Sequence, residues 1–402
     1  MNHAYRHERR GSAKRPWLAA ALVLAMVPAG CARIELGAEP GIPPSAQTAD
    51  GPVRNIIFMI GDGMGTGHIT AARLRAYGTQ GSLNLDRLPV VGHIRTYAAN
   101  ALVTDSAAAG TALSTGTKTD NRRIAMTPDG RPMYTVLEAA RDHGMATGLV
   151  VTSTITHATP AVFAAHVPNR HDELAIASQL IDTGVDVLLG GGKTFFLPAS
   201  QAGGSRTDGR NLIEEAKTKG YEFVDSAAAL QSARGSRLLG LFANAGMTTA
   251  EPEPSLAEMT RRALEILSRS SKGFFIMIEG SQIDWASHKN NAEYTIRQTL
   301  LFDDAVKLAV DFALKNRNTL VVVTADHETG GMAINGGALD GSQLNIGWTS
   351  KQHTAVDVPV FAIGPRALDF TGVYENTRVP KLFAEYLDIK EFPKTLQPVA
   401  PP

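Results

Sequence analysis

The sequence RNIIFMIGDG, residues 54–63, is a short apolar run closed by glycine and aspartate. A run of this length before turn residues is typical of a buried β-strand that ends in a loop. Similar apolar runs recur along the chain at 146–152, 186–189, 273–278, 319–324 and 358–363. Between them lie amphipathic stretches of helical length at 133–143, 172–182, 255–268 and 292–314. This alternation predicts an α/β fold, a three-layer αβα sandwich whose doubly wound, mostly parallel central sheet has helices on both faces.

The composition excludes several classes of protein. The chain has 402 residues, of which 44% are hydrophobic and 19% are charged, so it can bury a sizeable core and is not disordered as a whole. Its 39 basic and 39 acidic residues leave no positive excess of the kind that binds nucleic acid. The single cysteine, Cys31, excludes an intrachain disulfide and a cysteine-based zinc site. Any metal ion must therefore be held by histidines and carboxylates.

The first thirty residues are typical of an export signal. Residues 1–30 carry five basic residues and one acidic residue, followed by an uncharged stretch at 17–28 that is too short to span a bilayer. The sequence VPAGC that ends at Cys31 resembles a bacterial lipoprotein cleavage site, with Cys31 as the lipidated residue, although Pro28 stands where a leucine is usual. An ordinary signal peptide with an incidental cysteine is the alternative. Both interpretations predict an exported protein, either periplasmic or anchored by lipid to the bacterial cell envelope.

The rest of the chain divides into three parts. Residues 31–52 are rich in Pro, Gly and Ala and have no helical or strand period, as expected of a tether. Residues 53–391 show no internal repeat and no break in composition, which predicts one domain. The Pro-rich end, residues 392–402, is predicted to be a flexible tail.

Polar residues of the kind that bind metal ions come close after the apolar runs. In a parallel sheet, such residues gather at one edge, where the strands end. A lone Asp or His at such a place is more often a satisfied polar residue than a ligand, but so many at one edge favour a metal site. These residues are Asp62, His157, Thr159, Glu279, Asp284, His288, Asp326, His327 and, just before the last strand, His353.

The spacing of these residues suggests how they share ions. Asp284 and His288 are four residues apart, so on a helix both project from one face and can hold one cation. Alone, that pair would more simply be a surface ion pair. Asp326 and His327 are adjacent at the end of a strand, where both side chains can converge. Mixed His and Asp sets suit Zn²⁺, while Asp, Glu and Thr oxygens suit Mg²⁺, and the residues suffice for more than one ion.

The sequence TDSAAAGTA, residues 104–112, supplies a candidate nucleophile. The small residues after Ser106 predict a compact helix, and its first turn favours an anion because of the free backbone N–H groups and the helix dipole. Taken alone, Ser106 or Asp105 is more simply a helix cap. The predicted metal site favours a catalytic role for Ser106, since a metal ion can activate the hydroxyl without a Ser-His-Asp triad.

Four motifs together resemble the alkaline phosphatase family. They are NIIFMIGDGM at 55–64, TDS at 104–106, EGSQID at 279–284 with His288, and TADHETGG at 324–331. The resemblance covers roughly residues 54–364 in the same linear order. It implies phosphomonoester hydrolysis through a covalent phosphoserine, with two zinc ions and one magnesium ion as cofactors. Small phosphomonoesters and inorganic phosphate would be its partners. The resemblance implies a homodimer, and a monomer is the alternative for this shorter chain.

The resemblance also implies a role for each matching residue. Ser106 would be the nucleophile, and Arg170 would bind the phosphoryl oxygens. The metal ligands would be Asp284, His288 and His353 for the first zinc, Asp326 and His327 for the second, Asp62 shared between the second zinc and magnesium, and Thr159 and Glu279 for magnesium.

Two positions depart from the enterobacterial pattern of the family. His157 stands where that branch has an Asp near magnesium, and Trp285 stands where it has a Lys. Both resemble the branch found in animal and some marine bacterial enzymes. This resemblance implies weaker magnesium binding, and it implies that His157 and Trp285 lie next to the metal ligands without being ligands themselves. A purely structural histidine is the alternative for His157.

Three other functions remain open from the sequence. A phosphodiesterase or sulfatase of the same superfold would reuse the zinc pair, but such relatives generally lack the magnesium ligands or the serine. A zinc- or phosphate-storing binding protein and a structural envelope protein are the other two, and neither needs the complete set of catalytic residues. The natural substrate, and any role for residues 194–251, cannot be inferred from the motifs.

Overall fold

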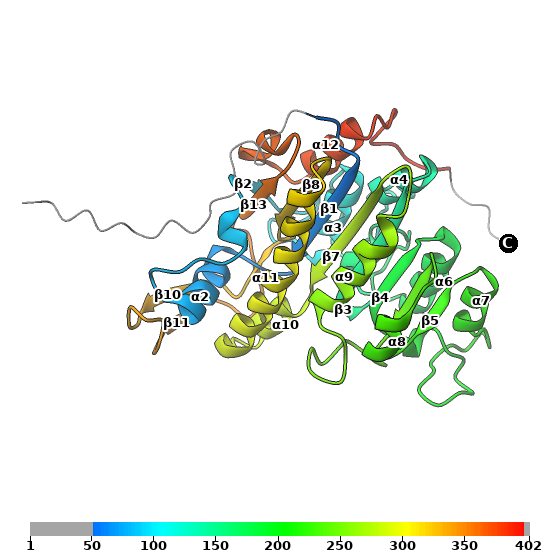
Figure 1. Ribbon diagram of the computed structural model, residues 1–402, viewed down its shortest axis with the longest axis horizontal. Helices are drawn as coiled ribbons and strands as arrows, with labels where there is room; N and C mark the ends of the chain where they lie inside the picture. Colours follow the sequence, from blue (N-terminus) through cyan, green and yellow to red (C-terminus); the bar gives the residue numbers. More distant parts are fainter. Residues whose placement is uncertain (1–50, 398–402) are drawn as a thin grey trace, which may run out of the picture. The chain divides into compact units, whose positions relative to one another are not determined.

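The computed structural model describes residues 51–397, which form a ten-stranded sheet between layers of helices (Figure 1). The strand order is β14-β2-β13-β8-β1-β7-β3-β4-β6-β5. Strand β13 is antiparallel to both of its neighbours, and every other pair in the sheet is parallel. The predicted α/β fold with a mostly parallel sheet is confirmed.

The strands of this sheet are β1 (Asn55–Gly61), β2 (Val90–Arg95), β3 (Ala146–Thr154), β4 (Val187–Gly191), β5 (Glu222–Val224), β6 (Leu238–Leu241), β7 (Phe274–Gly280), β8 (Thr319–Thr324), β13 (Val358–Ile363) and β14 (Gly372–Glu375). Two short ribbons stand apart from it. One joins β10 (Met332–Gly336) to β11 (Asn345–Trp348), and the other joins β9 (Glu328–Thr329) to β12 (His353–Thr354).

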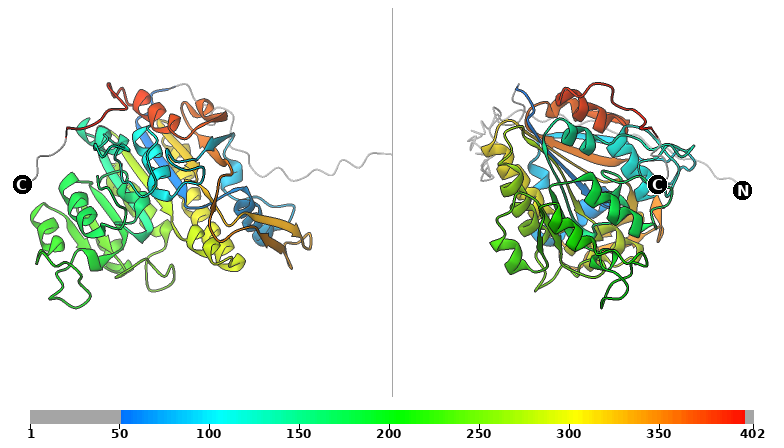
Figure 2. Two further views of the ribbon diagram at one scale, coloured as in Figure 1. Left: turned by 180° about the vertical axis from the view of Figure 1, so that it is seen from behind. Right: turned by 90° about the vertical axis from the view of Figure 1, so that its right-hand side faces the viewer.

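Helices cover both faces of the sheet. Figures 1 and 2 show α9 and α11 on one face, while α3, α4 and α12 lie on the other. The α-helices are α2 (Thr66–Tyr77), α3 (Ser106–Thr115), α4 (Val136–Asp142), α5 (Ala158–Ala161), α6 (Glu173–Thr183), α7 (Leu212–Thr218), α8 (Ala227–Ser232), α9 (Leu256–Leu267), α10 (Gln282–His288), α11 (Ala292–Lys315) and α12 (Arg378–Tyr386). No helix among residues 51–397 is long and apolar enough to cross a membrane.

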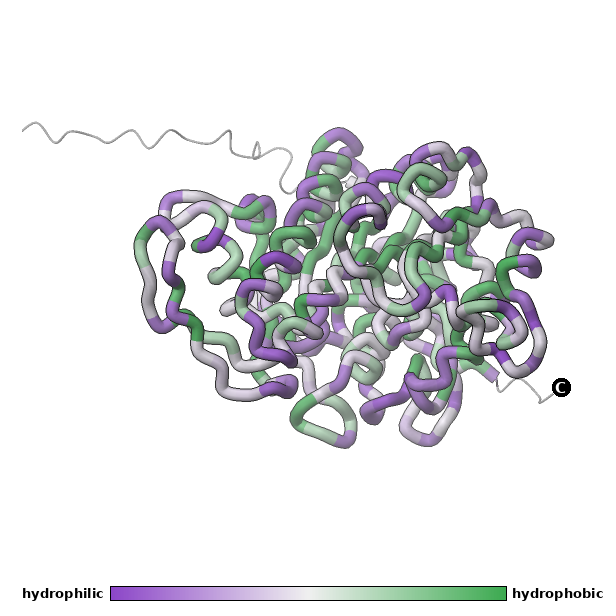
Figure 3. The backbone as a smooth tube through the Cα atoms, turned by 90° about the horizontal axis from the view of Figure 1, so that it is seen from below, coloured by the Kyte–Doolittle hydropathy of each residue, from purple (hydrophilic) through white to green (hydrophobic). Residues whose placement is uncertain are grey.

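The core lies along the central strands. All residues of β1, β7 and β8 are buried, as expected of parallel strands that are covered on both faces. In Figure 3 the hydrophobic colour is concentrated inside and the hydrophilic colour on the outer helices and loops. The loops that follow these strands are therefore anchored in the buried apolar core.

The register of the central strands sets where the predicted ligands lie. Ile60 on β1 pairs with Glu279 on β7 and with Thr324 on β8, so the three strands end at nearly the same level. Asp62 and Asp326 follow within two residues of their strand ends. The fold thus brings residues that are more than 200 positions apart to one edge of the sheet.

The described part of the C-terminal segment differs from the flexible tail predicted for 392–402. The Tyr134 amide donates to the Lys394 carbonyl (3.0 Å), and the Leu396 amide donates to the Pro132 carbonyl (2.8 Å). Residues 392–397 are therefore held along the segment before α4, a pairing between distant segments that a Pro-rich composition does not reveal. The predicted signal peptide, Cys31 and all but two residues of the predicted tether lie outside the described residues, as do residues 398–402.

Candidate active site

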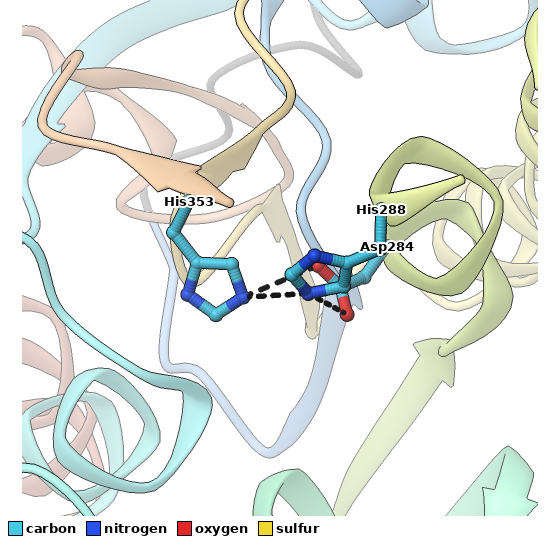
Figure 4. A group of neighbouring side chains, drawn as sticks. All are labelled: Asp284, His288 and His353. Carbon is cyan, nitrogen blue, oxygen red and sulfur yellow. Dashed lines mark hydrogen bonds and ion pairs between the residues drawn. The ribbon is translucent and has the colours of Figure 1, made fainter. Parts of the chain in front are cut away.

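Asp284, His288 and His353 form the first of three clusters beyond the carboxyl ends of the central strands (Figure 4). Helix α10 places Asp284 and His288 one turn apart, and ribbon β9–β12 brings in His353. The His288 Nε2 lies 3.3 Å from Asp284 Oδ2, and the His353 Nε2 lies 3.4 Å from Asp284 Oδ1. The two Nε2 atoms are 3.2 Å apart, a distance that suits nitrogens that converge on one cation.

Backbone carbonyls orient both histidines of this cluster. The Nδ1 of His288 is 2.6 Å from the Lys351 carbonyl oxygen, and the Nδ1 of His353 is 2.8 Å from the Thr104 carbonyl oxygen. A carbonyl can only accept, so each Nδ1 carries the hydrogen and each Nε2 presents a lone pair to the cluster. This is the usual arrangement of histidines that bind a metal ion.

Asp62, Asp326 and His327 form the second cluster, and all three side chains are fully buried. The His327 Nε2 lies 3.2 Å from Asp326 Oδ2 and 3.5 Å from Asp62 Oδ1. The Ser106 hydroxyl lies 3.2 Å from the same nitrogen. The candidate nucleophile thus borders the second cluster, as the sequence motifs imply.

Asp105 and Ser106 divide the capping and reactive roles between them. Asp105 is the N-cap of α3, and its Oδ1 accepts a hydrogen bond from the Ala108 amide (2.9 Å). Ser106 is the first residue of the helix and is 2% exposed. Because Asp105 satisfies the helix end, the Ser106 hydroxyl remains free to face the clusters.

The third cluster brings His157 next to Asp62 and Glu279. Among the described residues, neither carboxylate finds a hydrogen-bond partner, and the same holds for the buried Thr159 hydroxyl and the His157 Nδ1. Buried polar atoms without partners are rare, because each costs about 1–3 kcal/mol. These oxygens form a donor set that suits Mg²⁺.

Burial and crowding of like charges perturb the carboxylates. Burial, followed by the charges of Asp326 and Asp284, raises the pKa of Asp62 well above its usual range. Burial raises the pKa of Glu279 to about 8. Burial also favours the neutral form of Asp284, but His288 and His353, which donate hydrogen bonds to it when they are protonated and no cation is bound, outweigh burial and hold the pKa of Asp284 well below its usual range.

Cations fit this arrangement of charges. Asp62, Glu279, Asp284 and Asp326 are each at most 5% exposed, and burying carboxylates without a compensating charge is costly. Asp62 belongs to both the second and the third cluster, so its two oxygens can serve neighbouring ions. The donor types match the ions: the first two clusters combine nitrogen with carboxylate, which suits zinc, and the oxygens of Asp62 and Glu279 in the third suit magnesium.

The guanidinium of Arg170 contacts Asp105, the residue before Ser106, and is held from two sides. Its Nη1 donates to Asp105 Oδ2 (3.2 Å), and its Nη2 lies 3.1 Å from the His157 Nε2. The Trp285 ring meets His157 edge to face, with 5.9 Å between the ring centres. The structure thus gathers all the described site residues that the sequence analysis named.

Thr329 and Asp105 are two site residues that the sequence analysis did not assign. The Thr329 hydroxyl donates to Asp284 Oδ1 (2.5 Å) and lies 3.3 Å from His327 Nδ1, so it links the first two clusters. Asp105 contacts Arg170, but in the sequence it reads only as a helix cap. Thr329 follows His327 by two residues, and the alternation of a strand was the available signal.

Comparison with known proteins gives the same family at every level. The alkaline phosphatase family model matches residues 53–343 and 338–389. Alkaline phosphatase 4 of Bacillus subtilis is 36% identical over 81% of this chain and 87% of its own length. The solved alkaline phosphatase of the Antarctic bacterium TAB5 is 34% identical, with a TM-score of 0.78 over 85% of this chain and 100% of that one. A variant of that enzyme, solved with magnesium bound, has a TM-score of 0.76 at 34% identity over 85% of this chain and 99% of that one.

These matches span nearly the whole described chain, and the matched proteins share its central sheet as well as its sequence. The chain therefore belongs to the alkaline phosphatase family and is a metal-dependent enzyme that hydrolyses phosphate monoesters.

Proposed function

We propose that Ser106 is the nucleophile of this phosphomonoesterase and that Arg170 binds the phosphoryl group. The observation that carries the proposal is the position of the Ser106 hydroxyl, 3.2 Å from a nitrogen of the second cluster and in the first turn of α3. A helix N-terminus favours an anion at this point. Arg170 lies on the same side through its bond to Asp105.

We further propose that the enzyme holds two zinc ions and one magnesium ion. Donor chemistry supports this assignment: zinc at the first two clusters, and magnesium at the carboxylates of the third, Asp62 and Glu279, together with the Thr159 hydroxyl. Magnesium in the TAB5 variant is consistent with it. When bound, such ions act as Lewis acids that favour the serine alkoxide and neutralise charge on the transferred phosphoryl group and the leaving oxygen.

The residues of the chain then carry two displacements. The Ser106 Oγ loses its proton and forms a bond to phosphorus while the ester P–O bond breaks, and the leaving oxygen takes up a proton to become the alcohol. Water next attacks the phosphoserine, the Ser106 O–P bond breaks, a proton from the water returns to Ser106, and inorganic phosphate is released. The guanidinium of Arg170 is a planar fork that binds two phosphoryl oxygens, which favours a dianionic monoester over a diester.

The substitution Ser106→Ala tests the nucleophile. We expect the variant to lose turnover of p-nitrophenyl phosphate while its zinc content stays at the wild-type level, because Ser106 is not a proposed ligand. Wild-type kinetics in the variant would refute the assignment. Faster cleavage of bis-p-nitrophenyl phosphate than of the monoester by the wild-type enzyme would instead favour the phosphodiesterase alternative.

We also propose that the enzyme is exported, with residues 1–30 as the signal peptide and Cys31 as the site of a lipid anchor. The support is the sequence pattern of basic residues, an apolar stretch and small residues before the cysteine. In this proposal the catalytic domain works in the periplasm or at the surface of the cell envelope.

A homodimer is our proposal for the assembly. On strands β2 and β14, Val91 is 49% exposed and Val373 is 57% exposed, and both lie on a face that the described residues leave uncovered. The next rows on that face carry Arg95 and Glu375, which pair at 2.8 Å. A two-fold axis brings the same patch of both copies together, so the apolar side chains of this face would be buried against those of the second copy.

A further inference from the structure

The stretch 194–251, which has no recognisable motif, ends in a loop at 242–249 that touches the active site. Gly246 in this loop lies directly against the ring of Trp285. A Cβ atom at Gly246 would be 2.4 Å from Cη2 and 2.6 Å from Cζ3 of that ring, closer than any such contact allows. The backbone of Gly246 does not adopt a positive φ, so the ring alone demands glycine here.

The loop that carries Gly246 is fixed on both sides of the glycine. The Gly192 amide donates to the Ala245 carbonyl (2.9 Å), and the Met247 amide donates to the Thr152 carbonyl (3.1 Å). The Gln282 side chain adds a bond to the Met247 carbonyl (2.5 Å) and so ties the loop to the start of α10. A larger residue at position 246 would therefore move the ring of Trp285 more readily than the loop.

Trp285 is linked to Arg170, the proposed phosphate-binding residue, through the ring of His157. Trp285 meets His157 edge to face, and the His157 Nε2 lies 3.1 Å from Arg170 Nη2. The other nitrogen of His157 has no hydrogen-bond partner in the described part of the chain. The orientation of His157 thus depends on Trp285 on one side and on Arg170 on the other.

We propose that Gly246 is a positioning residue for Arg170 that acts through Trp285 and His157. The otherwise unassigned segment 194–251 thereby helps to set the affinity of the active site for phosphate. This inference rests on the proposed role of Arg170. It assigns a function to a residue that contacts neither the substrate nor any candidate ligand.

The substitution Gly246→Ala tests this coupling, with inorganic phosphate as a competitive inhibitor. A displaced ring would tilt His157 and misplace the guanidinium fork, and a misplacement of this kind costs roughly tenfold or more. We expect the inhibition constant of phosphate and the KM for p-nitrophenyl phosphate to rise roughly tenfold. Zinc content should stay unchanged, because none of the proposed zinc ligands moves.

Combining Gly246→Ala with a second substitution, Trp285→Phe or Arg170→Ala, distinguishes a positioning role from a general loss of stability. In Trp285→Phe the atoms that clash with a new Cβ are gone, so adding Gly246→Ala should cause no further loss of phosphate affinity. The same substitution should also have no further effect in an Arg170→Ala background. Gly148→Ala is the matched control, because Gly148 lies on strand β3 and a Cβ atom there would be 2.9 Å from the Leu267 side chain on helix α9. We expect it to lower the melting temperature without changing phosphate affinity.

The outcomes distinguish this inference from the proposed function. If Arg170→Ala leaves phosphate inhibition unchanged, the phosphate-binding role of Arg170 is wrong. If Arg170→Ala weakens inhibition but folded Gly246→Ala does not, only the positioning role of Gly246 fails. An equal loss from Gly246→Ala in the wild-type and Trp285→Phe backgrounds would also overturn it.

Discussion

Thr329→Val is the substitution from which we expect the clearest effect on metal binding. Thr329 is fully buried, and valine has nearly the same shape, so the change removes a hydroxyl and leaves the packing largely intact. The lost hydroxyl donates to Asp284 Oδ1 at 2.5 Å and lies 3.3 Å from His327 Nδ1. One atom therefore supports a proposed ligand in each of the two zinc clusters.

The size of the effect follows from the charge on Asp284. A hydrogen bond to a charged group contributes about 1.5–3 kcal/mol. Since 1.36 kcal/mol corresponds to a factor of ten, zinc affinity should fall roughly 10- to 100-fold. Losses of about 10- to 100-fold are also typical when a residue that orients a metal ligand is removed.

Competition with a chromogenic chelator measures this loss directly, because it reports zinc release without relying on turnover. Thr329→Ser retains the hydroxyl and should keep zinc affinity close to that of the wild type. Thr299→Val is the matched control, since its buried hydroxyl donates only to the Thr295 carbonyl within helix α11 (2.8 Å). Equal zinc affinity in Thr329→Val and Thr299→Val would refute the reasoning.

Three other expectations concern stability, the envelope and the assembly. Burial lowers the pKa of His166, but the hydrogen bond and charge of Glu138 outweigh it and raise the pKa. The stability advantage of the wild type over His166→Gln should therefore be complete below about pH 6.5 and shrink as the pH rises through the folded pKa, and urea unfolding that shows a constant difference from pH 5.5 to 9 would contradict this. Cys31→Ser should move the protein from the membrane fraction to the soluble fraction, and a wild type that is never membrane-associated would end the lipid-anchor proposal. Val91→Glu should convert a dimer to a monomer in size-exclusion chromatography with light scattering, whereas an unchanged mass would place the interface elsewhere.

The central strands were predictable because each is buried on both faces and reads as an unbroken apolar run. Strands β14 and β2, the outermost pair on one side of the sheet, were not predicted, because they are partly exposed and have no such run. Helix α4 begins at Val136 rather than at Met133, since Thr135 caps it and forms a capping box with Glu138. Local capping chemistry fixed that boundary, while the hydrophobic period extended past it.

The candidate ligands were predictable for a related reason. A residue that directly follows a parallel strand lies at the carboxyl edge of the sheet, and this placement does not depend on contacts with distant segments. Gly246 and the bond between Thr329 and Asp284 depend on how separate segments meet, and no spacing within one segment reveals such a contact. The antiparallel direction of β13 is likewise a property of the connection before it, not of its own residues.

The arrangement of the sheet explains why the metal ligands are held rigidly while the position of Arg170 depends on its side-chain contacts. Asp62 and Glu279 follow or end neighbouring central strands whose register holds them at one level, so their separation is fixed by backbone hydrogen bonds. Arg170 instead lies on a loop, and side-chain contacts with Asp105 and His157 hold its guanidinium. Substitutions on the loop at 242–249 should therefore change phosphate affinity before they change metal content. The fold therefore separates metal binding from phosphate binding. The proposed metal ligands lie mainly at the ends of central strands and on α10, whereas Arg170 is positioned by the ring of His157, which packs against Trp285.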